Sequence, residues 1–177
     1  MSEQELKKAF KFYKNEISYP NIRRVMQGET HQNERTPKYV NLMKQWFSGP
    51  HVRRGNLSGT LYRGIPFHPQ GNSLNNKSFT SWTPRLNKAL RFMYGSRNGT
   101  PGVILVMNAR KVPAYVRYNT GAPTYWNRAG GNTEEEVLLP PGRMTLGARN
   151  TKVAHVKSLF GNNNIQYSSV NILNYKN

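Results

Sequence analysis

The run of three glutamates at positions 134–136 has the clearest chemical potential, since it stands before three apolar residues and the turn Pro140-Pro141-Gly142. A threonine three residues before a glutamate is typical of a helix start, but the apolar run is too short for a helix and predicts a buried strand. Because side chains alternate along a strand, Glu134 and Glu136 share one face and Glu135 points away. Two carboxylates on one face favour a bound cation or a cationic transition state; solvated acids at a strand end are the alternative.

Arg63 is the second candidate for a chemical role. It comes directly after the β-prone run Thr60–Tyr62 and directly before Gly64. A strand end at this point would aim a planar guanidinium at a phosphate or a carboxylate, and the glycine would let a ligand approach the backbone. An ordinary surface arginine is the alternative interpretation.

A hydroxyl-rich segment supplies the third candidate. The sequence Ser-Phe-Thr-Ser-Trp-Thr at 78–83 predicts a strand on which Phe79, Ser81 and Thr83 face one way. The alternative is ordinary strand propensity followed by a helix cap at Thr83. The order of the three segments along the chain carries more weight than any one of them.

In that order, the segments resemble the arginine-serine-glutamate class of mono-ADP-ribosyltransferases, which includes iota-like bacterial toxins, vertebrate ecto-enzymes and the Alt and Mod enzymes of tailed phages. Arg63 stands in LYRG, Ser81 in FTSWT, and both Glu134 and Glu136 in EEEVLLPPG. The resemblance covers residues 59 to 173. The family's Ser-Thr-Ser is Ser-Trp-Thr here, which leaves the role of Thr83 open.

The resemblance implies an α+β fold of two packed, mainly antiparallel β-sheets with a cleft for NAD between them, and transfer of ADP-ribose to an acceptor with release of nicotinamide. Glu136 would stabilise the oxocarbenium-like ribose, and Glu134 would orient an acceptor guanidinium or act as its base. The expected NAD contacts are Arg63 with the phosphates or ribose, the Gly64 backbone with the nicotinamide amide, and Ser81 with Glu136 and the ribose, with Thr83 and Phe92 as further candidates. For Phe92 a core position is the favoured alternative.

The glycine-flanked loop over residues 120–133 presents two large aromatic residues just before the glutamates. Tyr125 and Trp126 stand where the resemblance implies an acceptor-recognition loop, so we expect them to contact the acceptor. A structural core role is the alternative. Glu135 is expected to be dispensable, and no glycine-rich dinucleotide motif or P-loop is present.

These residues need elements to position them. Apolar periodicity predicts helices from Leu6 to Ile17, from Asn21 to Gln27 and from Pro37 to Phe47. A fourth helix is expected to begin after a Thr83 cap, with Pro84 in its first position, and to end at Gly95. The chain is thus expected to be one domain over 1–177, with a helical part at 1–58 and a mostly β core at 59–177.

Short β-prone runs separated by turn residues predict the strands of that core. They are Thr60–Tyr62, Ser78–Thr83, Gly102–Met107, Ala114–Tyr118, Glu135–Leu139, Met144–Leu146, Val153–Val156 and Ile165–Leu173. Residues 66–77, 95–101, 120–133 and 161–164 are expected to be loops.

The amino-acid composition excludes several kinds of catalytic and metal site. The 177 residues carry 26 Lys and Arg against 8 acidic residues, a formal charge of +18, and include no cysteine. The lack of cysteine excludes thiolate sites. All eight acids are glutamates, which excludes Asp-rich calcium loops and a Ser-His-Asp triad. The four histidines are scattered, and no metal site is expected. No run is apolar enough to span a bilayer, so no membrane partner is expected.

The charge predicts polyanionic partners but names none of them. We expect an enzyme of the bacterial cytoplasm, phage-encoded or delivered, that modifies arginines of the transcription or translation machinery. ADP-ribosylation of RNA or DNA is one alternative, and a non-enzymatic nucleic-acid-binding module is another. A basic N-terminal face is expected to be solvated, with docking to an anionic assembly or the ribosome as the second interpretation. It is formed by Lys7, Lys8, Lys11, Lys14, Arg23 and Arg24.

Overall fold

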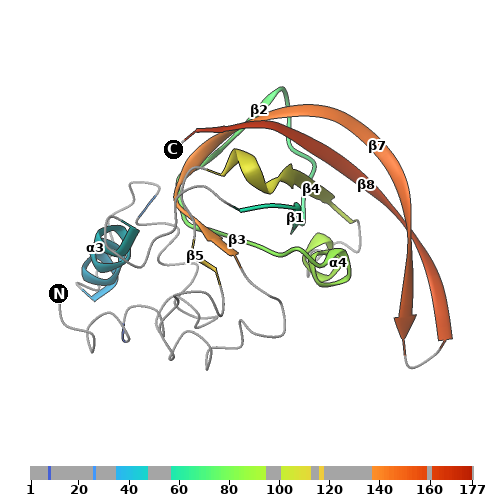
Figure 1. Cartoon of the computed structure of the whole chain (residues 1–177), viewed down its shortest axis with the longest axis horizontal. Coiled ribbons are helices and arrows are strands. Elements are labelled where there is room, and N and C mark those ends of the chain that lie inside the picture. Colours follow the sequence, from blue (N-terminus) through green and yellow to red (C-terminus); the bar gives the residue numbers. More distant parts are fainter. Residues whose placement is uncertain are drawn as a thin grey trace.

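The structure is a computed structural model that describes residues 35–47, 57–94, 101–112, 116–117, 137–158 and 161–176, with Lys8 and Met26 described singly. These residues form helices α3 (Arg35–Phe47) and α4 (Leu86–Met93) and the 3-10 helix η1 (Ala109–Lys111), together with eight strands (Figure 1). The strands are β1 (Thr60–Ile65), β2 (Ser73–Asn76), β3 (Thr80–Trp82), β4 (Val103–Asn108), β5 (Val116–Arg117), β6 (Val137–Leu139), β7 (Gly142–Ser158) and β8 (Gly161–Lys176).

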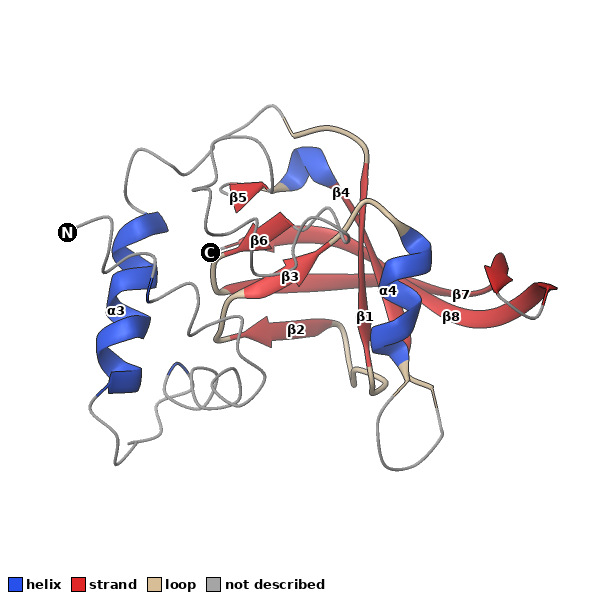
Figure 2. Cartoon of the chain, turned by 90° about the horizontal axis from the view of Figure 1, so that it is seen from below, coloured by secondary structure: helices blue, strands red, loops and turns tan. Residues whose placement is uncertain are grey.

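The strands form two sheets. The larger sheet has the order β1-β4-β8-β7-β2, in which only the β4–β8 pair is parallel, and the smaller sheet has the antiparallel order β3-β6-β5. The long strands β7 and β8 arch over the molecule and continue beyond the other strands as a curved ribbon (Figures 1 and 2). The predicted α+β fold with two mainly antiparallel sheets is confirmed.

The two sheets share one apolar core. Trp82, Val137 and Leu139 of the smaller sheet belong to the same buried cluster as Leu105 and Val170 of the larger sheet. We call this side of the larger sheet its inner face. Fully burying one such side chain stabilises the fold by about 1.5–3 kcal/mol, so the core fixes the two sheets relative to each other.

Helix α4 packs on the opposite, outer face of the larger sheet. Its residues Ala89, Leu90 and Met93 form a second buried cluster with Ile104 and Tyr167. The helix approaches β1 at Gly64 so closely that a Cβ there would lie 2.1 Å from the carbonyl oxygen of Ala89. Only glycine fits between this strand and this helix.

Helix α3 packs against the segment that leads into β3. Its buried residues Val40, Met43 and Phe47 share one face, as the periodicity predicts, and the ring of Phe47 stacks on Phe79 with centroids 5.3 Å apart. The helix begins at Arg35, two residues before the predicted start. The predicted helices at 6–17 and 21–27 lie outside the described ranges, and no described helix is long and apolar enough to cross a membrane.

Several predicted boundaries are wrong. Residues 66–77 were expected to be a loop, but Ser73–Asn76 form β2 because they pair with β7 at the edge of the sheet. The two strands expected at 144–146 and 153–156 are parts of the single strand β7, and β8 begins at Gly161 inside an expected loop. Helix α4 begins at Leu86 rather than at Pro84, and Tyr94 follows it as its C-cap residue.

Candidate active site

Arg63 and Ser81 are brought together at the junction of the two sheets. Arg63 is half-buried in the middle of β1, and its Nη1 donates a hydrogen bond to the backbone carbonyl oxygen of Ser81 at 3.0 Å. Next to this bond, the N–H of Tyr62 donates to the carbonyl of Thr83 at 2.8 Å, and the N–H of Thr83 donates to the carbonyl of Tyr62 at 3.0 Å. Two of the three predicted segments therefore meet through three hydrogen bonds.

The third segment is joined to the second by a β-ladder. Ser81 pairs with Leu138 and Trp82 pairs with Val137, which is the residue directly after Glu136 in the chain. Glu134 and Glu136 lie outside the described residues, as do Tyr125 and Trp126.

Burial makes this ladder rigid. Val137, Leu138 and Leu139 are each no more than 1% exposed, and Trp82 is equally buried with its Nε1 donating to the hydroxyl of Thr80 at 3.0 Å. The buried indole therefore has a partner for its polar group. Burial and pairing together fix the register of β6 against β3.

Tyr175 fastens the turn that follows β6. Its hydroxyl donates a hydrogen bond to the carbonyl of Pro140, and burial raises the pKa of this hydroxyl above its ordinary value. The hydroxyl sits against Gly142, where an added Cβ would lie 2.7 Å from the phenolic oxygen. Tyr175 and Tyr62 were both missed by sequence reasoning, because contacts between residues so far apart leave no local motif.

The structure requires a glycine at position 64 for a reason that the sequence did not show. The predicted reason was ligand access to its backbone, whereas the glycine is required by the packing of α4. The direction of its backbone still suits ligand binding. Tyr62 directs its N–H and C=O away from β4 toward Thr83, and Gly64, two residues later, directs its own to the same edge of β1.

Phe92 and Thr83 differ in their surroundings. Phe92 is 51% exposed on α4, so the core position favoured from the sequence is wrong for this ring. Thr83 is buried, and its hydroxyl oxygen accepts a hydrogen bond from the N–H of Arg85 at 3.1 Å. Thr83 is not the helix cap itself, which is Arg85, but its hydroxyl shapes the turn into α4.

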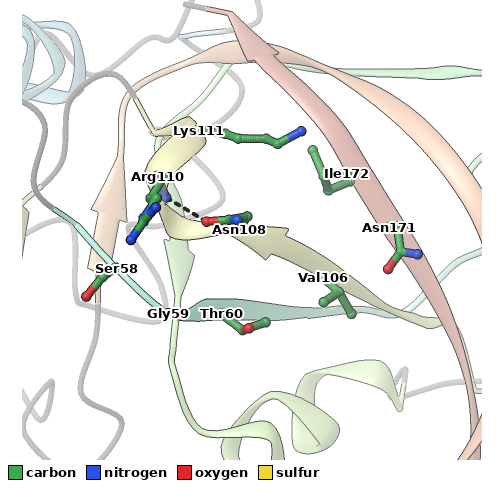
Figure 3. A pocket seen from close by; sticks show the side chains of 9 residues that line it. All are labelled: Ser58, Gly59, Thr60, Val106, Asn108, Arg110, Lys111, Asn171 and Ile172. Atoms are coloured by element: carbon green, nitrogen blue, oxygen red, sulfur yellow. Dashed lines mark hydrogen bonds between the residues drawn. The ribbon is translucent and has the colours of Figure 1, made fainter.

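A separate depression of about 530 Å³ lies away from these residues (Figure 3). Its polar lining consists of Ser58, Thr60, Asn108, Arg110, Lys111 and Asn171, and we call it the basic depression. None of the residues Arg63, Gly64, Ser81 or Phe92 lines it. Among the described residues no three His, Cys, Asp or Glu side chains are grouped as a metal site would need.

No protein-family model matches the chain, and no curated protein matches it by sequence. Solved structures do match it. The enzymatic component of the C2 toxin from Clostridium botulinum is similar with a TM-score of 0.62 at 12% identity, over 97% of this chain and 44% of its own length. The chain thus spans less than half of that toxin component.

Two further similar structures are those of ADP-ribosyltransferases. The Vis toxin, an ADP-ribosyltransferase from Vibrio splendidus, matches with a TM-score of 0.55 and 16% identity over 97% of this chain and 74% of its own. A eukaryotic mono-ADP-ribosyltransferase mutant, solved in complex with NAD, matches with a TM-score of 0.56 and 15% identity over 98% of this chain and 66% of its own. With Arg63 and Ser81 joined and the strand after Glu136 paired beside them, the chain has the fold of the mono-ADP-ribosyltransferases.

Proposed function

We propose that this protein transfers ADP-ribose from NAD to an acceptor and releases nicotinamide. The observation that carries the proposal is the hydrogen bond from Arg63 to the carbonyl of Ser81, beside the ladder that leads to Glu136. A resemblance noted in three short sequence segments did not require those segments to meet in space. Their meeting on a fold shared with ADP-ribosyltransferases supports a common site.

The reaction breaks the bond between the ribose C1′ and the nicotinamide nitrogen, and the electron pair leaves with nicotinamide. Positive charge develops on the ribose. We assign the carboxylate of Glu136 the role of stabilising this charge. The acceptor's nucleophilic nitrogen then bonds to C1′ and loses a proton, for which we assign Glu134 as the base. Ser81 is assigned to hold Glu136 and the ribose.

The described residues fit NAD as the co-substrate. Arg63 places a guanidinium, which binds phosphate oxygens in pairs, at the sheet junction. Gly64 aims its backbone N–H and C=O at an open strand edge, which suits a carboxamide that both donates and accepts. The exposed ring of Phe92, on the helix packed against Gly64, is available for stacking on nicotinamide.

We further propose arginine side chains as the acceptor group, recognised by Glu134, Tyr125 and Trp126. The similar enzyme Vis has been solved in complex with agmatine, whose guanidinium is that of an arginine side chain. A carboxylate two residues before the catalytic one would pair with such a group in a bidentate manner. Proteins of the transcription or translation machinery in a bacterial cytoplasm are the acceptors we propose, because their anionic complexes suit a charge of +18.

The test is label transfer from NAD to proteins of a bacterial lysate. The wild type should label acceptors, and Glu136→Gln should lower both transfer and NAD cleavage by about 10²–10³-fold, the cost typical of losing one electrostatic stabiliser of a transition state. Glu134→Gln should lose transfer to arginine but retain NAD cleavage, and Glu135→Gln should resemble the wild type. Transfer that persists undiminished in Glu136→Gln would refute the assignment.

A further inference from the structure

The basic depression lies on a part of the larger sheet that α4 leaves uncovered. Thr60 begins β1, Asn108 ends β4, and Asn171 lies on β8, so three neighbouring strands contribute to its floor. Arg110 and Lys111 come from η1, which follows β4 directly. Figure 3 shows that these side chains surround one hollow between η1 and β8.

Hydrogen bonds fix the polar groups of this hollow. The Oδ1 of Asn108 accepts from the backbone N–H of Arg110 at 3.0 Å, which leaves the amide nitrogen of Asn108 as a donor. The ammonium of Lys111 donates to the carbonyl of Leu173 at 2.5 Å, which holds it over β8 with two further donors. With the hydroxyls of Ser58 and Thr60, the lining is rich in donors.

The described residues around the hollow carry positive charge. Arg110 and Lys111 line it, and no described residue is acidic, since all eight glutamates of the chain lie outside the described ranges. Two cations beside several hydrogen-bond donors favour an anionic ligand.

The lining distinguishes between classes of anion. Among the described residues that line it there is no aromatic ring, and the apolar members are Val106 and Ile172, so these residues offer a nucleobase no surface on which to stack. Fixed cations, amides and hydroxyls are instead the groups that contact phosphate and sugar. The two cations of the hollow are a small part of the chain's formal charge of +18, and so high a charge attracts polyanions, which favours an extended anion over a small one.

We propose that the basic depression binds the phosphodiester backbone of a nucleic acid, without reading its bases. Thr60 lies three residues before Arg63 on β1, about 10 Å along the strand, so the two side chains point to opposite faces of it. A nucleic acid held at Thr60 would lie on the other face of β1 from the Arg63 guanidinium, near enough for a protein bound to that nucleic acid to reach the candidate active site. Only this last step rests on the proposed transferase function.

The test is fluorescence anisotropy with a 20-base-pair DNA duplex and an RNA duplex of equal length, measured over a range of salt concentrations. The double variant Arg110→Gln with Lys111→Gln should bind about 10-fold more weakly at 0.1 M salt, and its salt slope should fall by about two, or about one per lost phosphate contact. NAD cleavage without an acceptor should be unchanged. Binding is also measured on Glu136→Gln, so that loss of transferase activity leaves this test intact.

The matched control removes two charges elsewhere. Lys152 and Lys157 are exposed on the distal part of the β7–β8 ribbon, and Lys152→Gln with Lys157→Gln should weaken binding less than 3-fold. Equal weakening in the two double variants would overturn the proposal, because binding would then follow net charge alone. A wild type that does not bind would also overturn it. Competition by inorganic phosphate at low millimolar concentration would indicate that the ligand is a free phosphate instead. Equal competition by polyglutamate would indicate an acidic protein instead.

Discussion

The guanidinium of Arg63 and the backbone carbonyl of Ser81 are hydrogen-bonded across the junction of two different sheets. An arginine that reaches a neighbouring sheet holds the backbone of Ser81, the residue proposed to hold Glu136 and the ribose, in addition to any contact it makes with a ligand. The bond therefore gives Arg63 two separable roles. Replacement by a shorter cation tests them.

Arg63→Lys keeps the positive charge but cannot reproduce the planar fork of donors. A hydrogen bond to a charged donor is worth about 1.5–3 kcal/mol, so we expect kcat/KM for NAD cleavage to fall by about 10–100-fold. Arg63→Ala should lose more, because it also removes the charge. Unfolding of both variants by denaturant provides the control, and kinetics unchanged in Arg63→Lys would argue against the positioning role.

Gly64→Ala should destabilise the fold rather than alter the chemistry directly. The new Cβ would lie 2.1 Å from the carbonyl oxygen of Ala89 and 2.8 Å from the nitrogen of Met93, both of them backbone atoms of α4. We expect a loss of about 1–3 kcal/mol in the free energy of unfolding, the usual cost of overpacking. Gly71→Ala measures a different cost, since its φ of 72° strains an alanine while its Cβ meets open space. A free energy of unfolding within about 0.5 kcal/mol of the wild type in Gly64→Ala would show that α4 moves aside without cost.

Phe92→Ala is expected to raise KM for NAD by about 5-fold while leaving the melting temperature within about 2 °C of the wild type. The ring is 51% exposed, so little core packing is lost, whereas aromatic stacking is worth about 0.5–1.5 kcal/mol. Phe67 has a similar exposure of 48%, and Phe67→Ala serves as the control. If both variants behave alike in steady-state kinetics, Phe92 has no special contact with NAD.

Tyr175 makes stability depend on alkaline pH. Burial raises the pKa of its hydroxyl above the ordinary value of 10.0, so above that pH the unfolded chain releases this proton while the folded chain keeps it. The free energy of unfolding should therefore fall as pH rises past 10, by up to about 1.4 kcal/mol per pH unit from this group. Denaturant titrations at pH 8 to 11 measure the slope.

Tyr175→Phe provides the comparison for that slope. At neutral pH the variant should be less stable by about 1–3 kcal/mol, because the buried carbonyl of Pro140 loses its donor. Above pH 10 its stability should fall less steeply than that of the wild type. Parallel curves for the two proteins would assign the alkaline loss to other tyrosines.

The sequence predicted those elements whose signal is local. The apolar stripe of helix α3 is visible in its sequence. Strands β1, β3, β4 and β6 coincide with dense β-prone runs. The arginine, serine and glutamate segments could therefore be assigned to strands. The meeting of those strands could be expected only from the resemblance. The pairing of Tyr62 with Thr83 joins residues that no local pattern connects.

The missed elements depend on pairing with distant partners. Strand β2 reads Ser-Leu-Asn-Asn, which favours a turn, and becomes a strand because β7 offers a free edge. The residues Gly147-Ala148-Arg149-Asn150 resemble a turn between two strands, yet β7 passes through them with a shift in register between Leu146 and Arg149. A Cβ at Gly147 would lie 2.8 Å from the side chain of Leu173, so this glycine marks close packing within a bulge.

The β7–β8 ribbon continues past the other strands of the larger sheet (Figures 1 and 2). In its distal part Val153 pairs with Gln166 of β8 and is 58% exposed, whereas Val103 and Leu105 of β4 pair with strands on both sides and are fully buried. A backbone segment held by few buried apolar contacts opens locally at a low cost in free energy. Amide hydrogens of the distal ribbon should therefore exchange with deuterium earlier than those of β4.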